Sequence, residues 1–167
     1  GIGLQYATSN RGGCHVRGYT ISPEVLGVPV KMDQRATEGK PEMVIELQNL
    51  GAALDATGAC LFTTFGIGAE ELAALLSSVT GVKYTSADLL KAGERIWNLE
   101  RQWNLAVGLT SRDDTLPTRL LNDPIASGPS RGEVSRLREM LPAYYELRGW
   151  DAEGIPTPAK LKQLSLA

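Results

Sequence analysis

Apolar residues recur at helical spacing over positions 41–54. Met43, Leu47, Leu50 and Leu54 follow one another at intervals of four, three and four residues, which places them on one face of a helix. The proline at the first position suits a first helical turn, where its missing N–H leaves no hydrogen bond unmade. The glycine four residues beyond the last leucine is a typical helix stop. The pattern therefore predicts a helix over 41–54.

The same periodicity predicts further helices along the chain. They are expected at 4–10 (as the end of a helix), 69–79, 86–107 and 133–147, with a short one after Thr157-Pro158. Ser86 suits the N-cap position of the longest of them. We expect its buried face to consist of Leu89, Ile96, Trp97, Trp103 and Leu105.

Strand signals are few in comparison. The one short candidate, 28–30, is interrupted by Pro29. The sequence therefore predicts an all-α fold, an irregular multi-helix domain with a Gly-rich N-terminal loop, formed by residues 1–167 as a single unit.

Composition narrows the class of protein. The chain has 167 residues, 43% of them hydrophobic and 22% charged, which excludes intrinsic disorder. The chain has 17 Lys and Arg against 19 Asp and Glu, so it has no excess of positive charge that would indicate nucleic-acid binding. No apolar run approaches the roughly 20 residues of a membrane helix. The start shows neither a signal peptide nor an initiator Met, so we expect a processed chain or part of a longer one.

The Gly-rich loop at 11–19 has the most unusual composition of the chain. His15 is the only histidine, and an imidazole exchanges protons near neutral pH. Arg11 and Arg17 flank it and offer fixed donors that match phosphate or carboxylate oxygens. The glycines let the main chain approach a ligand closely. An ordinary surface loop with a solvated histidine fits the composition as well.

A second candidate segment contains Asp55 and Cys60. A thiolate is a soft ligand suited to zinc and iron–sulfur clusters, and a carboxylate at a helix end can accept hydrogen bonds from a heterocycle. Two alternatives are open from composition alone. Cys60 can be a small buried residue of the core, or it can form a disulfide with Cys14. Two cysteines cannot complete a four-cysteine metal site.

The remaining charged and aromatic residues favour structural roles. The pairs Glu94-Arg95 and Glu100-Arg101 are interpreted as a charged helix face with local ion pairs. Asp113-Asp114 is interpreted as a turn. The large aromatic residues expected in the core are Trp97, Trp103, Tyr144, Tyr145 and Trp150.

Six short motifs occur in a fixed order along nearly the whole chain. They are Arg-Gly-Gly-Cys-His at 11–15 with Gly-Tyr at 18–19, Gln48-Asn49, Asp55-x-x-Gly58-x-Cys60, Gly93-Glu94-Arg95-Ile96 with Asn98-Leu99-Glu100-Arg101, Asp113-Asp114-x-Leu116-Pro117, and Tyr144-Tyr145-x-x-Arg148-Gly149-Trp150-Asp151. In this order they resemble the C-terminal helical domain of the tungsten-containing aldehyde ferredoxin oxidoreductases. The resemblance favours a cofactor site over the surface-loop and buried-cysteine interpretations.

The resemblance implies roles for the segment at 55–60. Cys60 would be the fourth thiolate of a [4Fe–4S] cluster, whose other three ligands belong to a C-x2-C-x3-C set outside this chain. Asp55 would bind one of two pterins that chelate tungsten through dithiolene sulfurs. Ala59 would contact the same pterin through its backbone, at a position where relatives usually carry Leu.

The resemblance also implies roles for the loop. Arg11 and Arg17 would face the cofactor, with a lysine familiar at the second position. His15 would lie beside the metal and serve in proton transfer or substrate polarisation. The cofactors expected for the whole enzyme are therefore a tungsten bis-pyranopterin and a [4Fe–4S] cluster.

By the same resemblance, the whole enzyme would be a cytoplasmic oxidoreductase that oxidises aldehydes to carboxylic acids with ferredoxin as electron acceptor. The family's N-terminal β-rich and middle helical domains are missing here, so we expect the fragment alone to be inactive. Those domains are its expected partners, and a homodimer through the uncovered apolar surface is a further expectation. The alternatives are a tungsten-dependent benzoyl-CoA reductase-type subunit and a non-catalytic helical interaction module.

Overall fold

The computed structural model describes residues 1–167 and contains helices and turns but no β-strand. Short 3-10 or π-helical turns carry the label η. The elements are α1 (Ile2–Thr8), η1 (Val16–Gly18), η2 (Ser22–Leu26), α2 (Lys40–Thr57), η3 (Leu61–Phe65), α3 (Ala69–Thr80), α4 (Ser86–Ala106), η4 (Ser111–Asp113), α5 (Thr118–Asn122), α6 (Leu137–Arg148) and α7 (Pro158–Gln163). The all-α prediction is confirmed.

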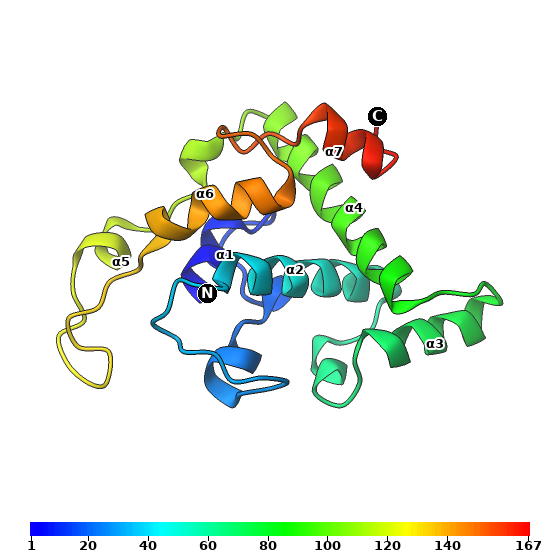
Figure 1. Cartoon of the computed structure of the whole chain (residues 1–167), viewed down its shortest axis with the longest axis horizontal. Helices are drawn as coiled ribbons and strands as arrows, with labels where there is room; N and C mark the ends of the chain where they lie inside the picture. Colours follow the sequence, from blue (N-terminus) through cyan, green and yellow to red (C-terminus); the bar gives the residue numbers. More distant parts are fainter.

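Helix α2 is the centre of the arrangement (Figure 1). It packs against α4 most extensively, and also against η1 and α6, while α3 packs against α4. Two glycines permit these close approaches. A Cβ on Gly93 of α4 would come within 1.8 Å of the carbonyl oxygen of Asn49, and a Cβ on Gly51 within 2.6 Å of that of Arg17. The crossing of α2 with α4 and η1 therefore depends on the absence of these side chains.

Several predicted helix limits differ from the structure. Thr85, and not Ser86, caps α4, because its hydroxyl accepts a hydrogen bond from the Asp88 amide. The helix predicted over 133–147 begins only at Leu137. The residues before Leu137 contact α5 instead, where the N–H of Ser135 donates to the carbonyl of Leu120 at 2.8 Å. Helix α5 itself was not predicted.

The buried face of α2 is rotated from the predicted stripe. Met43 and Leu54 are buried as predicted, but Leu47 and Leu50 are only half-buried. The fully buried positions include Val44, Gln48 and Ala52. Because α2 is surrounded on several sides, polar and small residues are buried alongside the apolar ones.

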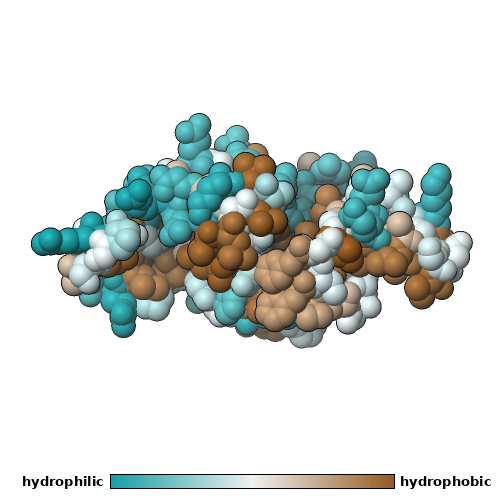
Figure 2. Space-filling view, turned by 90° about the horizontal axis from the view of Figure 1, so that it is seen from below, coloured by the Kyte–Doolittle hydropathy of each residue, from teal (hydrophilic) through white to brown (hydrophobic).

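The surface retains many apolar side chains. Trp103, predicted in the core, is 71% exposed on α4, and Leu105 is half-buried. Phe62 and Phe65 of η3 are also exposed. Figure 2 shows apolar side chains gathered on the face seen from below. None of the helices combines the length and the apolar character that crossing a membrane would require.

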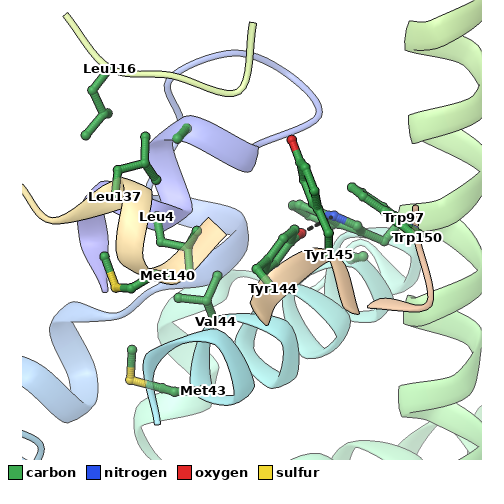
Figure 3. Close-up of a cluster of buried hydrophobic side chains, with 12 residues drawn as sticks. Leu4, Met43, Val44, Trp97, Leu116, Leu137, Met140, Tyr144, Tyr145 and Trp150 are labelled. Atoms are coloured by element: carbon green, nitrogen blue, oxygen red, sulfur yellow. Dashed lines mark hydrogen bonds between the residues drawn. The ribbon is translucent and has the colours of Figure 1, made fainter. Parts of the chain in front are cut away.

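The core lies between α1, α2, α4 and α6 (Figure 3). The indole N–H of Trp97 donates to the Tyr144 hydroxyl at 3.2 Å, and that hydroxyl donates to Gln48 Oε1 at 2.7 Å. Arg148 is fully buried here and donates to Gln48 at 2.6 Å. The centre of the protein is therefore a polar network inside an apolar shell. A smaller cluster joins α2, α3 and α4 through Ala53, Leu54, Leu72 and Leu89.

The charged residues of α4 do not pair along the helix, so that interpretation was wrong. Glu94 pairs with Lys160 at 2.9 Å, and Glu100 pairs with Arg17 at 2.6 Å. Arg101 forms a buried pair with Asp114 at 2.7 Å. These contacts tie α4 to the rest of the fold. The predicted turn at Asp113 is confirmed as η4, although the second aspartate serves this buried pair.

Candidate functional site

The loop between α1 and η1 is held from below by two buried glutamines. Gln5 of α1 donates to the Cys14 carbonyl at 2.8 Å, and Gln48 of α2 donates to Gln5 at 2.8 Å. Asn10 donates to the Trp97 carbonyl at 2.9 Å. A Cβ on Gly18 would collide with Gln5 at 2.1 Å. The loop therefore lies flat on α1 and α2, and its glycine is required for the contact.

Four charged side chains meet beside this loop. Arg11 donates to Asp55 Oδ2 at 3.2 Å, and Arg17 Nε lies 3.2 Å from the same oxygen. Arg17 also donates to both oxygens of Glu100, at 2.6 and 2.8 Å. Its guanidinium lies 5.4 Å from the centre of the Trp97 ring. The structure thus brings together three of the predicted site residues, Arg11, Arg17 and Asp55, and adds Glu100.

The two arginines differ in burial, which separates their roles. The Arg17 side chain is 6% exposed, whereas Arg11 is 46% exposed. Arg17 is therefore a fixed cation of the fold that holds Asp55 and Glu100. Arg11 can turn toward a ligand at little cost, since exposed ion pairs contribute little to stability.

The thiol of Cys14 lies in the same loop. Arg11 Nε and the amide of Val16 each donate to its sulfur at 3.3 Å. Burial raises the pKa of this thiol, but the hydrogen bonds from Arg17, Arg11 and Val16 outweigh burial and hold the pKa below its ordinary value. Cys14 is therefore the thiol of the chain that the surroundings favour as thiolate.

His15 contacts aromatic side chains on two sides. Its Nδ1 lies 3.1 Å from the Tyr6 hydroxyl, and its ring centre lies 6.3 Å from that of Tyr19. Tyr19 in turn contacts Phe65 of η3 at 5.8 Å. His15 makes no hydrogen bond or ion pair with the Asp55 cluster. The aromatic contacts instead connect the histidine to η3.

Cys60 stands at the N-cap of η3 and is exposed. Both cysteines are free, so the disulfide alternative is wrong, and so is the buried-core alternative for Cys60. Gly58, with φ of 75°, ends α2 and turns the chain from Asp55 toward Cys60. The amide of Ala59 donates to the Thr57 hydroxyl at 3.3 Å. The acid and the thiol thus lie on either side of one tight turn.

The donor set fits part of the expected cofactors. The exposed Cys60 thiol is accessible as one cluster ligand, and the exposed carboxylate of Asp55 is accessible to a heterocycle. No group of three or more His, Cys, Asp or Glu side chains forms a metal site within residues 1–167. The remaining cluster ligands would have to come from outside the chain.

The sequence analysis did not identify Tyr6 and Gln5 at this site. Gln48 was part of a motif, but only the structure shows that it is buried and supports Gln5 beneath the loop. Tyr6 has no signal in sequence, because only the folded loop brings His15 to its hydroxyl.

Comparison with solved structures defines the class of fold first. The active site complex BamBC of benzoyl coenzyme A reductase, in complex with 1,5-dienoyl-CoA, has a TM-score of 0.64 and 21% identity. The match covers 86% of this chain and 21% of that chain. The chain therefore has the helical fold of a segment of that complex.

Sequence comparison then identifies the family. The family profile described as "Aldehyde ferredoxin oxidoreductase, domains 2 & 3" matches residues 1–166. Tungsten-containing aldehyde ferredoxin oxidoreductases of Pyrococcus furiosus, Pyrococcus abyssi and Thermococcus kodakarensis are 52%, 53% and 50% identical over 99 to 100% of this chain. The chain belongs to the aldehyde ferredoxin oxidoreductase family. It spans 28% of the length of these relatives.

Proposed function

We propose that this chain is the C-terminal part of an enzyme that oxidises aldehydes to carboxylic acids and passes the electrons to ferredoxin. The supporting observation is the 50 to 53% identity over nearly all of the chain to relatives named for this activity. The reaction consumes one aldehyde and one water, and it releases the carboxylic acid, two protons and two electrons. Two one-electron ferredoxins would accept the pair.

The cofactors we propose are a tungsten bis-pyranopterin and a [4Fe–4S] cluster. Asp55 and the Ala59 backbone would hold one pterin, with Arg11 and Arg17 facing it, and Cys60 would be one cluster ligand. When bound, the tungsten centre supplies two-electron chemistry and the cluster supplies one-electron transfer. Exposure of Asp55 and Cys60 on either side of the turn at Gly58 supports this assignment.

His15 would act on the substrate side of the site. An imidazole can polarise the aldehyde oxygen or move a proton near neutral pH. The half-buried ring, held by Tyr6 and lying beside Tyr19, is consistent with a group fixed for this purpose. Arg17 forms ion pairs with both Asp55 and Glu100 of α4. Because Glu100 fixes the guanidinium, Arg17 keeps Asp55 in place.

The decisive experiment is an assay of the anaerobically purified whole enzyme. We expect it to reduce ferredoxin with simple aldehydes and to contain tungsten. Reduction of benzoyl-CoA without aldehyde oxidation would overturn the proposal in favour of the benzoyl-CoA reductase alternative. Absence of both activities and of tungsten would favour the helical interaction module.

The chain alone should lack the complete cofactors, because it spans 28% of its relatives and contains only two cysteines. Metal analysis and a visible absorption spectrum of the 167-residue protein test this point. Stoichiometric tungsten together with cluster absorption would contradict it.

A further inference from the structure

Two consecutive residues of α1 hold two consecutive residues of the loop. Gln5 donates to the Cys14 carbonyl at 2.8 Å, and the Tyr6 hydroxyl lies 3.1 Å from His15 Nδ1. The Tyr6 and His15 rings meet edge to face, with their centres 6.1 Å apart and an angle of 71° between their planes. The main chain and the imidazole of the loop are therefore fixed by the same short helix.

The hydrogen bond to Nδ1 can run in either direction, and the chemistry of the two groups favours one. No other hydrogen bond involves the Tyr6 hydroxyl, and none involves His15 Nε2. If Nδ1–H donated to Tyr6, the phenol hydrogen and the Nε2 lone pair would both lack partners in the chain. If Tyr6 donates to Nδ1, the Nε2–H and the phenol oxygen lone pairs are left instead, so the number of unpaired groups is the same and the strength of the bond decides. A phenol O–H is a more acidic donor than a neutral imidazole N–H, and the imidazole lone pair is a better acceptor than a phenol oxygen, so the bond from Tyr6 to Nδ1 is the stronger one.

We propose that Tyr6 is a positioning residue that donates to Nδ1 and holds the neutral His15 imidazole as its Nε2–H tautomer. His15 then presents a hydrogen-bond donor, and not a base, to the open side of the loop. This inference rests on the proposed function, in which the donor would polarise the carbonyl oxygen of the aldehyde. It selects substrate polarisation over proton abstraction as the first task of His15.

The helix that carries Tyr6 is itself held in place, so the contact between Tyr6 and His15 is fixed. Gln48 donates to Gln5 at 2.8 Å and to the Thr8 hydroxyl at 3.0 Å, so α1 is tied to α2 on both sides of Tyr6. Gln5 and Thr8 are buried. The phenol therefore has little freedom to leave the imidazole.

Nitrogen-15 NMR tests the tautomer directly, because His15 is the only histidine of the chain. The spectrum is recorded at about pH 8.5, where an ordinary imidazole is neutral and an ordinary phenol is protonated. We expect the 167-residue chain to show Nε2 as the protonated, pyrrole-type nitrogen and Nδ1 as the pyridine-type nitrogen. A pyrrole-type Nδ1 would overturn the proposal, and this measurement needs no variant.

Tyr6→Phe provides the second arm. Removing the hydroxyl should allow the Nδ1–H tautomer to become populated, so that the two nitrogen signals move toward each other. Tyr19→Phe is the matched control, since Tyr19 contacts the ring without a hydrogen bond to it. The amide spectrum of each variant reports whether it is folded. Equal tautomer populations in wild type and folded Tyr6→Phe would also overturn the proposal.

An activity assay of the whole enzyme distinguishes a failure of this inference from a failure of the proposed function. In the whole enzyme, Tyr6→Phe should lower kcat for aldehydes about fivefold, the factor that loss of one ordinary hydrogen bond gives. Tungsten content should stay unchanged. If the tautomer changes while kcat does not, the role of His15 in the proposed function fails, and the assignment of the tautomer stands.

Discussion

Gly93 of α4 lies against the main chain of α2 so closely that a methyl group there would come within 1.8 Å of the Asn49 carbonyl oxygen. Gly93→Ala should therefore push α4 away from α2. We expect a loss of about 1–3 kcal/mol or more in the free energy of unfolding, measured with urea, because an overpacked contact forces the backbone to shift.

The matched control for that change is Gly81→Ala at the end of α3. Gly81 has φ of 72° with no atom near a would-be Cβ, so its replacement costs only the strain of a left-handed backbone, about 1–2 kcal/mol. A Gly93→Ala variant that is as stable as the wild type would mean that the close approach at Gly93 relaxes without cost.

The buried Arg101–Asp114 pair should be sensitive to mutation. Arg101 Nη1 and Nη2 donate to the two carboxylate oxygens at 2.8 and 2.7 Å, and both side chains are buried. Asp114→Asn leaves a buried guanidinium without its counter-charge, which costs about 3–5 kcal/mol. Asp33→Asn, at an exposed pair with Arg35, should change the midpoint of urea unfolding little. A small effect at Asp114 would show that water reaches Arg101.

Tyr145 should make the fold sensitive to alkali. Burial, together with its hydrogen bond to Asp114, raises the pKa of this phenol well above its ordinary value of 10.0. The unfolded chain therefore loses the phenol proton first as the pH rises above about 10, so stability falls there while it is unaffected at neutral pH.

Tyr145→Phe tests that pH dependence. Above about pH 10 the stability of the variant should fall less steeply than that of the wild type. The two slopes should differ by up to about 1.4 kcal/mol per pH unit, which corresponds to one proton. Unfolding midpoints measured from about pH 8 to 11 give the slope of stability against pH for each protein. This range extends no more than about two pH units from the pKa of an ordinary phenol. Parallel curves for the two proteins would contradict the assignment.

The sequence predicted the helices well where one face is apolar and a glycine or cap ends the pattern. The limits of α3 and the glycine that ends α2 are examples. It placed Trp103 in the core because helical spacing does not tell which sides of α4 have neighbours. Similarly, the pairing of Glu100 with Arg17 joins residues 83 positions apart, which no local pattern reveals.

The sequence motifs predicted which residues form the candidate site, but they did not predict its geometry. The sequence identified the residues of the loop and of the segment at 55–60. It could not show that Arg11 and Arg17 converge on one oxygen of Asp55, because that contact requires η1 to pack on α2. The roles of His15, Ala59 and Cys60 toward cofactors remain predictions.

Arg11 should control the reactivity of Cys14. Its Nε donates to the sulfur, which helps to hold the pKa of the thiol below its ordinary value. Arg11→Ala should raise that pKa, reduce the thiolate fraction at neutral pH and slow alkylation of Cys14 several-fold. Mass spectrometry measures the rate, with alkylation of Cys60 in the same molecule as the internal control. Unchanged or faster modification of Cys14 would exclude this role of Arg11.

In the whole enzyme, the His15→Ala and Cys60→Ser variants should lose activity for different reasons. The histidine variant should lose most of its turnover while its tungsten content stays near normal, because in the proposed function the imidazole acts on the substrate. The cysteine variant should lose iron and transfer electrons to ferredoxin slowly, because the proposed cluster would lack one of its ligands. Metal analysis beside steady-state rates distinguishes the two. Full activity of His15→Ala would remove the histidine from the reaction.

The buried amide chain beneath the loop links its motion to that of the whole interior. The Cys14 carbonyl is held by Gln5, which Gln48 holds, and Gln48 is held in turn by Arg148 of α6. Lifting the loop would leave the amide nitrogen of the buried Gln5 without its acceptor. The Cys14 carbonyl beside His15 is therefore coupled to the buried interior, and the loop should move away from α1 less readily than an unsupported surface loop would.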